Sequence, residues 1–216
     1  MRQISRLSVI AVSAALLITL SSCSSTQSTL EADDQPSTPI ENREMTSDVQ
    51  ENKANGDSPQ GSVTDAANFE IAENEDGTVT ISRYIGTETD IMIPSQIGGK
   101  TVSAIGNVMG TTGAFEGCTS ITAVVIPDGV TEIQDNAFYG CASLETVTIP
   151  SSITLLRNCA FCDCPNLRAV YFKGDTPQQA NYVFDSTENV TMYYQDGTSG
   201  WENPWHGRPA EVYIPE

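Results

Sequence analysis

The sequence predicts a β-rich repeat solenoid, in which short rungs of equal length stack into one domain. Segments in the second half of the chain repeat at a constant interval, which separates Cys118 from Cys141 and Cys141 from Cys164, and their apolar residues keep the same register. A single repeat offers about eight apolar positions, which stabilise less than the roughly 35 kcal/mol that ordering the repeat costs. Repeats must therefore stack in order to fold. About four to five rungs, with a cap at each end, fit between residues 68 and 216.

Residues 1–22 have the features of a lipoprotein signal peptide. Two arginines precede an uncharged apolar stretch at 7–20, which as a helix would reach about 21 Å and fall short of the roughly 30 Å hydrocarbon core of a bilayer. The sequence Leu20-Ser21-Ser22-Cys23 resembles the lipobox of bacterial lipoproteins, whose cysteine is acylated. We expect an exported protein that is anchored at the bacterial membrane or cell surface only through lipid on Cys23. The alternative is an ordinary cleavage site followed by a chance cysteine.

Residues 23–67 predict a disordered acidic tether. From residue 24 to 67 there is no aromatic residue and no sustained period of 2 or 3.6, so the segment buries too little apolar surface to offset its ordering entropy. It carries nine acidic and two basic side chains, a net charge of −7. As a flexible coil it would span about 35 to 40 Å and hold the next domain clear of the lipid headgroups. A second small folded domain is the alternative.

The repeats themselves lie between residues 68 and 216. Three segments, which begin at Cys118, Cys141 and Cys164, align without gaps, so equivalent residues form columns. The columns hold Phe115, Phe138, Phe161 and Phe184; Ile121, Leu144 and Leu167; and the three cysteines themselves. We expect each column to line up inside the solenoid, with rungs about 4.8 Å apart.

An earlier and longer copy and two caps complete the domain. Residues 91–94 (Ile-Met-Ile-Pro) open a copy whose extra residues, in 95–102 and 106–113, predict loops because they are rich in glycine and small polar residues. Apolar alternation on both sides of Asp76-Gly77 predicts a hairpin that caps the N-terminal end. The candidates for the C-terminal lid are Trp201, Trp205, Tyr213 and Ile214.

The repeat resembles that of a known family. The pattern Cys-x-x-Leu-x-x-Val-x-Ile-Pro-x-x-Val-x-x-Ile-x-x-x-Ala-Phe-x-Gly, at 118–140 and 141–163, is similar to the BspA-type (Treponema pallidum type) leucine-rich repeats of bacterial surface proteins. The resemblance covers residues 68–216 and implies a right-handed leucine-rich-repeat solenoid. The sequence departs from the pattern at Asp163 and Lys173, where glycine and proline are expected, and has Cys162 at a variable position.

Alternation within the Val-x-Ile strands defines a candidate ligand-binding face. Because Val147 and Ile149 point inward, Thr148 must point to the opposite face of the sheet. The candidate residues are Met92, Val125, Thr148 and Tyr171, flanked by Arg168 and Glu145. Solenoid proteins bind along such sheets, and an aromatic residue beside an arginine is typical of binding hot spots. The alternative is a solvated strand face that has no ligand.

The cysteines of the repeats favour structural roles. Those of the repeat column fit as small buried apolar residues, and oxidation between adjacent rungs is the alternative. Cys159 and Cys162 are a candidate local disulfide, which export permits. Their Cys-x-x-Cys spacing also suggests zinc or redox chemistry, but no second cysteine pair or nearby histidine completes four ligands. The sequence therefore predicts no metal and no other cofactor.

Composition excludes several functional classes. With 10 Lys and Arg against 28 Asp and Glu, the net charge is −18 and the pI about 4.1, which argues against nucleic-acid binding. The sole histidine, His206, leaves little basis for a catalytic triad. No nucleophile elbow, phosphate loop, dinucleotide fingerprint or EF-hand is present. We therefore expect no enzymatic activity.

These observations predict a surface-displayed lipoprotein that binds a protein or glycan through its leucine-rich-repeat sheet. Relatives that the repeats resemble include adhesins, so adhesion to a host or another cell is the favoured function. The alternative is a structural or scaffolding lipoprotein of the cell envelope that has no host ligand. The fold does not identify the ligand.

Overall fold

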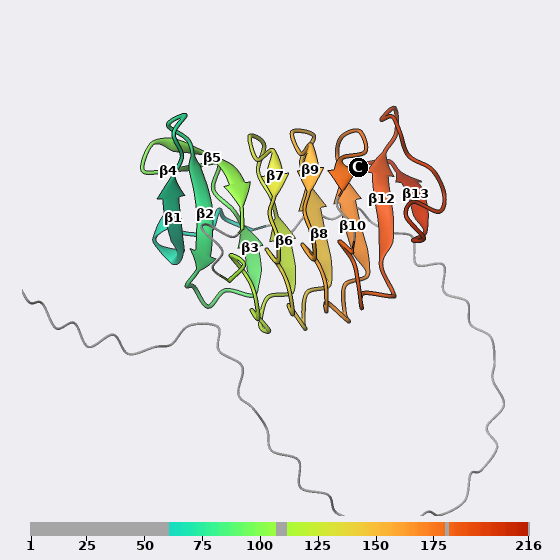
Figure 1. Ribbon diagram of the computed structural model, residues 1–216, viewed down its shortest axis with the longest axis horizontal. Helices are drawn as coiled ribbons and strands as arrows, with labels where there is room; N and C mark the ends of the chain where they lie inside the picture. Colours follow the sequence, from blue (N-terminus) through green and yellow to red (C-terminus); the bar gives the residue numbers. More distant parts are fainter. Residues whose placement is uncertain (1–60, 107–111, 180–181, 216) are drawn as a thin grey trace, which may run out of the picture.

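The computed structural model describes residues 61–106, 112–179 and 182–215 (Figure 1). The predicted signal peptide, Cys23 and the tether as far as residue 60 lie outside the described residues. In the part of the chain that is described, no helix is long and apolar enough to cross a membrane. The described residues form strands and turns, with one 3-10 turn at Ala66–Asn68.

Two sheets run along the solenoid, from β1 at one end to β13 at the other (Figure 1). Within each sheet the paired strands follow sequence order, except that β4 pairs only with β5. The six-stranded sheet is parallel and contains β3 (Asp90–Met92), β6 (Ala123–Val125), β8 (Thr146–Ile149), β10 (Ala169–Phe172), β12 (Thr191–Gln195) and β13 (Ala210–Tyr213). The seven-stranded sheet contains β1 (Phe69–Glu73), β2 (Val79–Tyr84), β4 (Gln96–Ile97), β5 (Lys100–Ile105), β7 (Glu132–Ile133), β9 (Leu155–Leu156) and β11 (Gln178–Gln179). Each central rung therefore contributes one strand to each sheet, as a β-rich solenoid requires.

The phenylalanine column predicted from the repeat is present and forms the centre of the core. Adjacent rings of Phe115, Phe138, Phe161 and Phe184 stack with centroids 4.8, 5.1 and 5.4 Å apart and with interplanar angles of 13° or less. Tyr84 extends the stack by one ring, 5.3 Å from Phe115. The spacing is close to the distance between neighbouring strands, so the rungs are in register along the stack.

The cysteine column supplies hydrogen-bond donors to the same core. Cys141 and Cys164 each place their Sγ 3.1 Å from the carbonyl oxygen of a phenylalanine in the preceding rung. Burial raises the pKa of Cys141, so its thiol stays protonated and can donate. Thr187, one repeat after Cys164, occupies the next position and donates to the Phe161 carbonyl at 2.7 Å. This position of the repeat therefore requires a small side chain that donates a hydrogen bond, and a hydroxyl group serves as well as a thiol.

The outer turns of the rungs keep their shape where the sequence departs from the repeat. Gly117 and Gly140 have φ values of 69° and 70°, and Asp163 and Ser186 continue this left-handed column at 53° and 54°. Aspartate tolerates this region better than most residues because its side chain can bond locally. Lys173, in place of proline, uses its free N–H to reach the Ile149 carbonyl at 3.0 Å. Neither departure disturbs the third rung.

One predicted loop is a strand pair instead. Residues 95–102, read from the sequence as a loop, contain β4 and the start of β5, which pair antiparallel across Gly98 and Gly99. Both glycines have positive φ, 60° and 76°, as a tight hairpin turn requires. Of the second predicted loop, 106–113, residues 107–111 lie outside the described residues.

Both ends of the solenoid are covered. At the N-terminal end β1 and β2 form the predicted hairpin, turning at Gly77 with a φ of 84°. Thr64 covers the edge of β3: its N–H donates to the Met92 carbonyl and its hydroxyl accepts from the Met92 N–H. Thr64 is also buried, so this residue packs against the edge of the six-stranded sheet.

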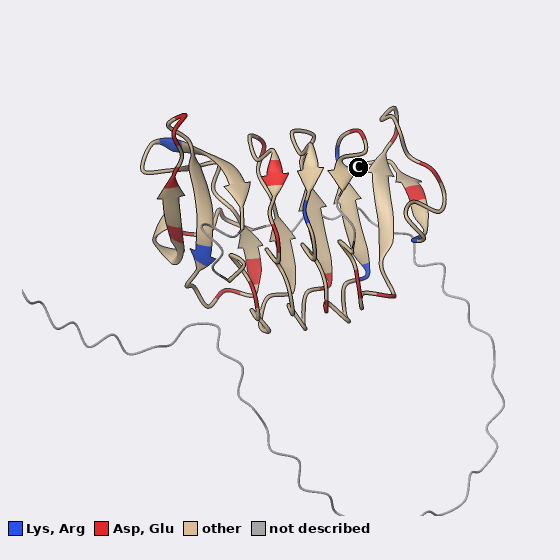
Figure 2. Ribbon diagram, viewed as in Figure 1, with Lys and Arg blue, Asp and Glu red and all other residues tan. Residues whose placement is uncertain are grey.

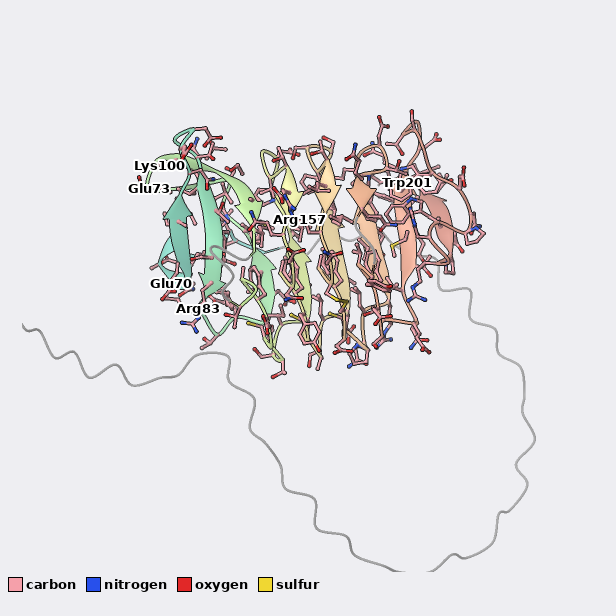
Figure 3. The ribbon with its side chains drawn as sticks, in the orientation of Figure 1. Glu70, Glu73, Arg83, Lys100, Arg157 and Trp201 are labelled. Atoms are coloured by element: carbon pink, nitrogen blue, oxygen red, sulfur yellow. A yellow bond between two sulfur atoms is a disulfide. The ribbon has the colours of Figure 1, made fainter. Side chains whose placement is uncertain are left out.

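Two tryptophans close the C-terminal end. Trp201, labelled in Figure 3, packs 4.7 Å from Phe172 and stacks on Tyr194 at 5.1 Å. The Trp205 ring lies 4.9 Å from that of Trp201. The prediction for Ile214 was wrong, because that side chain is 78% exposed. Tyr213 belongs to β13 and lies on the outer face of the six-stranded sheet, so it does not cover the core.

Candidate ligand-binding surface

The residues predicted as a ligand face share one register column of the six-stranded sheet. Met92 pairs with Val125, Val125 with Thr148, and Thr148 with Tyr171. The column continues beyond the predicted set to Tyr193 and Glu211. Alternation along each strand sends this column outward, because the residues before and after it point into the core.

Three tyrosines form a cluster at the C-terminal half of this face. The rings of Tyr171 and Tyr193 stack 5.2 Å apart with an interplanar angle of 19°. Tyr213 meets Tyr171 edge to face at 5.4 Å. We call Tyr171, Tyr193 and Tyr213 the tyrosine cluster. Because their faces pack on one another, these rings hold each other in place and carry their hydroxyl groups on rigid supports.

The tyrosine hydroxyl groups remain neutral at physiological pH. Burial raises the pKa of all three side chains. The nearby Glu211 carboxylate raises the pKa of Tyr193 further, because a second negative charge beside it is unfavourable. Tyr213 is 8% exposed and supports the other two rings, so Tyr171 and Tyr193 are the members that present apolar ring edges together with hydroxyl groups that both donate and accept hydrogen bonds.

The other predicted members of the face differ in what they can contact. Thr148 is only 5% exposed, because Val125 and Tyr171 flank it in the column, so it supports the surface without reaching a ligand. Arg168 and Glu145 are exposed and form an ion pair at 3.7 Å between adjacent rungs. An exposed pair of this kind contributes about 0–1 kcal/mol to stability, so both side chains are available to a partner at little cost.

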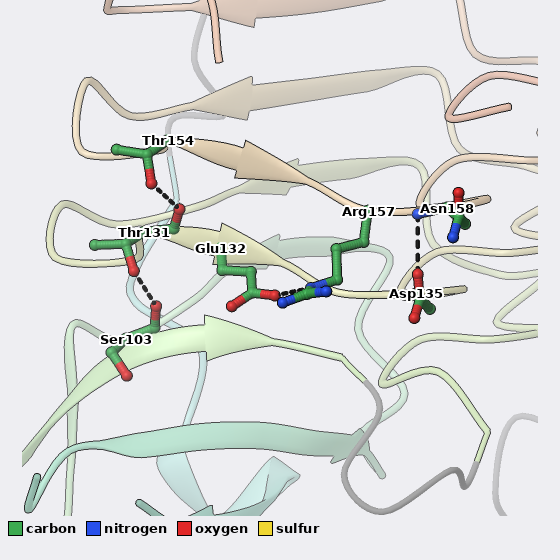
Figure 4. Close-up of polar contacts among 7 residues, drawn as sticks. All are labelled: Ser103, Thr131, Glu132, Asp135, Thr154, Arg157 and Asn158. Atoms are coloured by element: carbon green, nitrogen blue, oxygen red, sulfur yellow. Dashed lines mark hydrogen bonds and ion pairs between the residues drawn. The ribbon is translucent and has the colours of Figure 1, made fainter. Parts of the chain in front are cut away.

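The outer face of the seven-stranded sheet has a different character. Arg157 and Glu132 form an ion pair and hydrogen bond between adjacent rungs (Figure 4), and Glu132 raises the pKa of Arg157. On the same side, the hydroxyls of Thr131 and Thr154 donate to carbonyl groups one rung earlier. These polar groups are satisfied within the protein, and this face has no aromatic cluster among its described residues.

Charge is scattered over the solenoid rather than gathered at one site (Figure 2). From residue 68 onward there are 19 acidic and 6 basic side chains, a net charge of −13. A further ion pair joins Lys100 and Glu73 near the N-terminal end, where Figure 3 labels both residues. The described residues contain no group of three or more side chains that could hold a metal ion.

The cysteines outside the repeat column lie in the third rung. The structure joins Cys159 and Cys162 in a disulfide, with Cα atoms 4.7 Å apart. This distance lies within the range that disulfides tolerate. Cys141 and Cys164 are reduced and buried in the column described above, so no disulfide joins their two rungs.

Reasoning from the sequence missed two members of the tyrosine cluster. Met192-Tyr193-Tyr194 repeats Val170-Tyr171-Phe172 at a spacing that is shorter by one than the interval between the earlier repeats. The missing residue moved Tyr193 out of the aligned column. A search that allowed one gap would have found Tyr193, whereas the placement of Tyr213 depends on how the last strand pairs.

The fold defines the chain as a stacked β-solenoid of repeats, and comparison with known proteins identifies the repeat type. Residues 101–199 match the family model described as the BspA type Leucine rich repeat region, in six copies. The repeats of this chain are therefore BspA-type leucine-rich repeats. The family resemblance inferred from the sequence is confirmed.

Solved structures of bacterial leucine-rich-repeat proteins are similar to this chain. A leucine rich cell surface protein from Faecalibacterium prausnitzii is 30% identical with a TM-score of 0.51, covering 74% of this chain but 44% of that chain. A leucine-rich repeat protein from Bacteroides capillosus is 25% identical with a TM-score of 0.51, covering 61% of this chain and 99% of that one. The T. pallidum leucine rich repeat protein is 22% identical with a TM-score of 0.47, covering 72% and 84%. No curated protein matches the chain.

Proposed function

We propose that this protein is an exported lipoprotein, anchored through Cys23, that binds a protein partner on the outer face of its six-stranded sheet. The observation that carries the proposal is the tyrosine cluster of Tyr171, Tyr193 and Tyr213. Tyrosine is enriched at protein interfaces because a rigid ring supplies contact area at a low entropy cost while its hydroxyl supplies a hydrogen bond. A similar protein from F. prausnitzii is a cell surface protein, which supports the assignment to the surface.

The charge of the domain narrows the class of partner. A net charge of −13 from residue 68 onward attracts a neutral or basic protein surface and repels an acidic one. Glu211, beside Tyr193 in the same column, favours a basic contact at the cluster itself. Adhesion to a host protein or another cell fits these properties. The binding role requires no catalytic group, so we propose that the protein is not an enzyme.

The position of the cluster suits display away from an anchor. The described chain begins beside β3, where Thr64 covers the edge of the sheet. The tyrosines lie on β10, β12 and β13, toward the opposite end of the solenoid (Figure 1). A tether that joins at the β3 end therefore leaves the cluster at the end of the domain farther from the attachment point.

Replacing Tyr171 and Arg168 together by alanine tests the binding face. We expect binding of the full chain to immobilised host matrix proteins to weaken at least tenfold, since truncating a hot spot costs about 2 kcal/mol or more. The control is Gln178→Ala, an exposed residue on the seven-stranded sheet. Thermal unfolding of each variant verifies folding. Equal binding by folded double variant and wild type would remove this face from consideration.

Scaffolding in the cell envelope is the second candidate function. The same binding assay separates the two, because an adhesin retains host proteins whereas a scaffold retains only envelope proteins of its own cell. The anchor is tested by Cys23→Ser, which removes the acylated sulfur. We expect this variant to leave the membrane fraction while its repeats stay folded, and continued membrane association would contradict the anchor.

A further inference from the structure

A second candidate site lies at the C-terminal end of the solenoid and shares no residue with the tyrosine cluster. It is a cavity of about 260 Å³. Its lining residues come from β11, from the outer turn after it, and from the tight turn before β13: Gln179, Tyr182, Val183, Phe184, Asp185, His206 and Arg208. Pockets that hold drug-sized ligands measure about 300–1,000 Å³, so this cavity suits one small unit of a larger molecule.

Tyr182, at the rim of the cavity, has an unfavourable backbone conformation. The packing of its own side chain does not offset the free-energy cost of this conformation. Its φ is 63°, at the repeat position where Asn136 and Cys159 have φ values of 59° and 52°. Asparagine adopts this left-handed region readily, whereas a bulky aromatic residue does so rarely. The side chain is 72% exposed, so little apolar burial compensates. Tyr182 therefore carries an exposed ring at the rim of the cavity, on a backbone position that costs free energy.

Arg208 and His206 are fixed in position by the turn that carries them. The N–H groups of Trp205 and Arg208 each donate to the other residue's carbonyl, at 2.9 and 3.0 Å. His206 and Gly207 between them have positive φ, 47° and 78°, which is the geometry of a type I′ turn. The imidazole stands edge-on to the buried Trp205 ring at 5.1 Å.

The guanidinium group of Arg208 is oriented by one hydrogen bond and keeps further donors for a ligand. Its Nη2 donates to the Phe184 carbonyl at 2.9 Å. The other N–H groups of the planar fork are available to the cavity, since one bond uses one of five donors. Asp185, on the adjacent turn, adds an acceptor of opposite charge.

We propose that this cavity binds a neutral hexose unit of a glycan. Each hydroxyl of a sugar both donates and accepts, so its recognition needs donors and acceptors together, as Arg208, Gln179 and Asp185 provide. The exposed ring of Tyr182 offers a flat apolar surface for the C–H face of a sugar ring. Arg208 and Asp185 balance each other in charge, and the net −13 of the domain disfavours an acidic sugar.

The test measures binding of small sugars to the full chain by saturation-transfer NMR and titration. The probes are lactose, maltotriose and mannotriose, and sialyllactose serves as the acidic counterpart of lactose. We expect at least one neutral probe to bind with a Kd of about 1 mM or lower, and sialyllactose to bind more weakly than lactose.

Two variants locate the site. Tyr182→Asn installs the residue that Asn136 supplies at the same repeat position, so it should leave the melting temperature equal or higher while it weakens sugar binding at least tenfold. Asp185→Asn keeps the shape of an exposed side chain and should weaken binding at least threefold. The control is Tyr139→Ala, which removes an exposed tyrosine outside the cavity. The proposal is overturned if no neutral probe binds at about 10 mM, if Tyr182→Asn binds as the wild type does, or if sialyllactose binds more tightly than lactose.

Discussion

Substitutions of Thr187 measure how much the hydrogen bonds of the cysteine column contribute to the stability of the core. Its side chain is fully buried, and its hydroxyl bonds to two backbone groups of the preceding rung. It donates to the Phe161 carbonyl at 2.7 Å and accepts from the Cys164 N–H at 3.2 Å. Thr187→Val keeps the shape of the side chain but removes both bonds, so it isolates the polar contribution.

The expected effect follows from the two backbone groups that lose a partner. A buried unsatisfied donor or acceptor costs about 1–3 kcal/mol, so Thr187→Val should destabilise the domain by about 2–6 kcal/mol. Thr187→Ser retains the hydroxyl and loses one methyl group, which costs about 0.5–1.5 kcal/mol. For a domain of this size each kcal/mol lowers Tm by about 2–4 °C, so the two variants should differ measurably.

Reversible urea unfolding, followed by tryptophan fluorescence, measures the difference. Trp201 and Trp205 lie in the C-terminal cap, near the rung that contains Thr187, so their emission reports on this part of the solenoid. We expect the midpoint to fall in the order wild type, Thr187→Ser, Thr187→Val, with an unchanged slope. Equal midpoints for the two variants would show that the column is held by packing alone and would refute the reasoning.

Two further predictions concern other parts of the solenoid. Gly113→Ala should lower stability by more than about 3 kcal/mol, because an added Cβ would overlap the backbone carbonyl of Asn136; circular dichroism melting measures the loss, and an unchanged Tm would contradict the close approach. Burial and the neighbouring Glu88 raise the pKa of Tyr84. The protonated phenol therefore contributes fully to the free energy of unfolding below a pH of about 10, and this contribution declines at higher pH as the phenol ionises. Tyr84→Phe should therefore lose less stability than the wild type between about pH 8 and about pH 11 in urea unfolding, and an equal loss would exclude Tyr84 as the source.

Most of the fold could be predicted from local patterns in the sequence. The constant spacing of Phe115, Phe138, Phe161 and Phe184 predicted a single stack, and the rings lie 4.8 to 5.4 Å apart. The Asp76-Gly77 turn predicted the N-terminal hairpin. These features could be predicted because each depends either on residues close in sequence or on a strict period. Residues that recur at a constant interval form a column in space when the rungs stack.

The candidate surface could be predicted from the sequence only in part. Alternation placed Tyr171 and Thr148 on the outer face, but Thr148 proved to be covered by its neighbours in the column. Burial of a strand residue depends on the size of the side chains on adjacent strands, which the strand's own sequence does not contain. The change of spacing before β12 hid Tyr193 for the same reason, since only pairing with β10 reveals its register.

The sequence by itself determined that this chain stacks repeats, since no rung buries enough apolar surface to fold alone. It also determined which column faces inward, because alternation fixes the two faces of a strand. Only the tertiary structure decided where the tyrosines converge and that Tyr182, Asp185 and Arg208 share a cavity. These outcomes depend on how the last rungs and the C-terminal turn pack together, and contacts between segments far apart in the sequence leave no period to read.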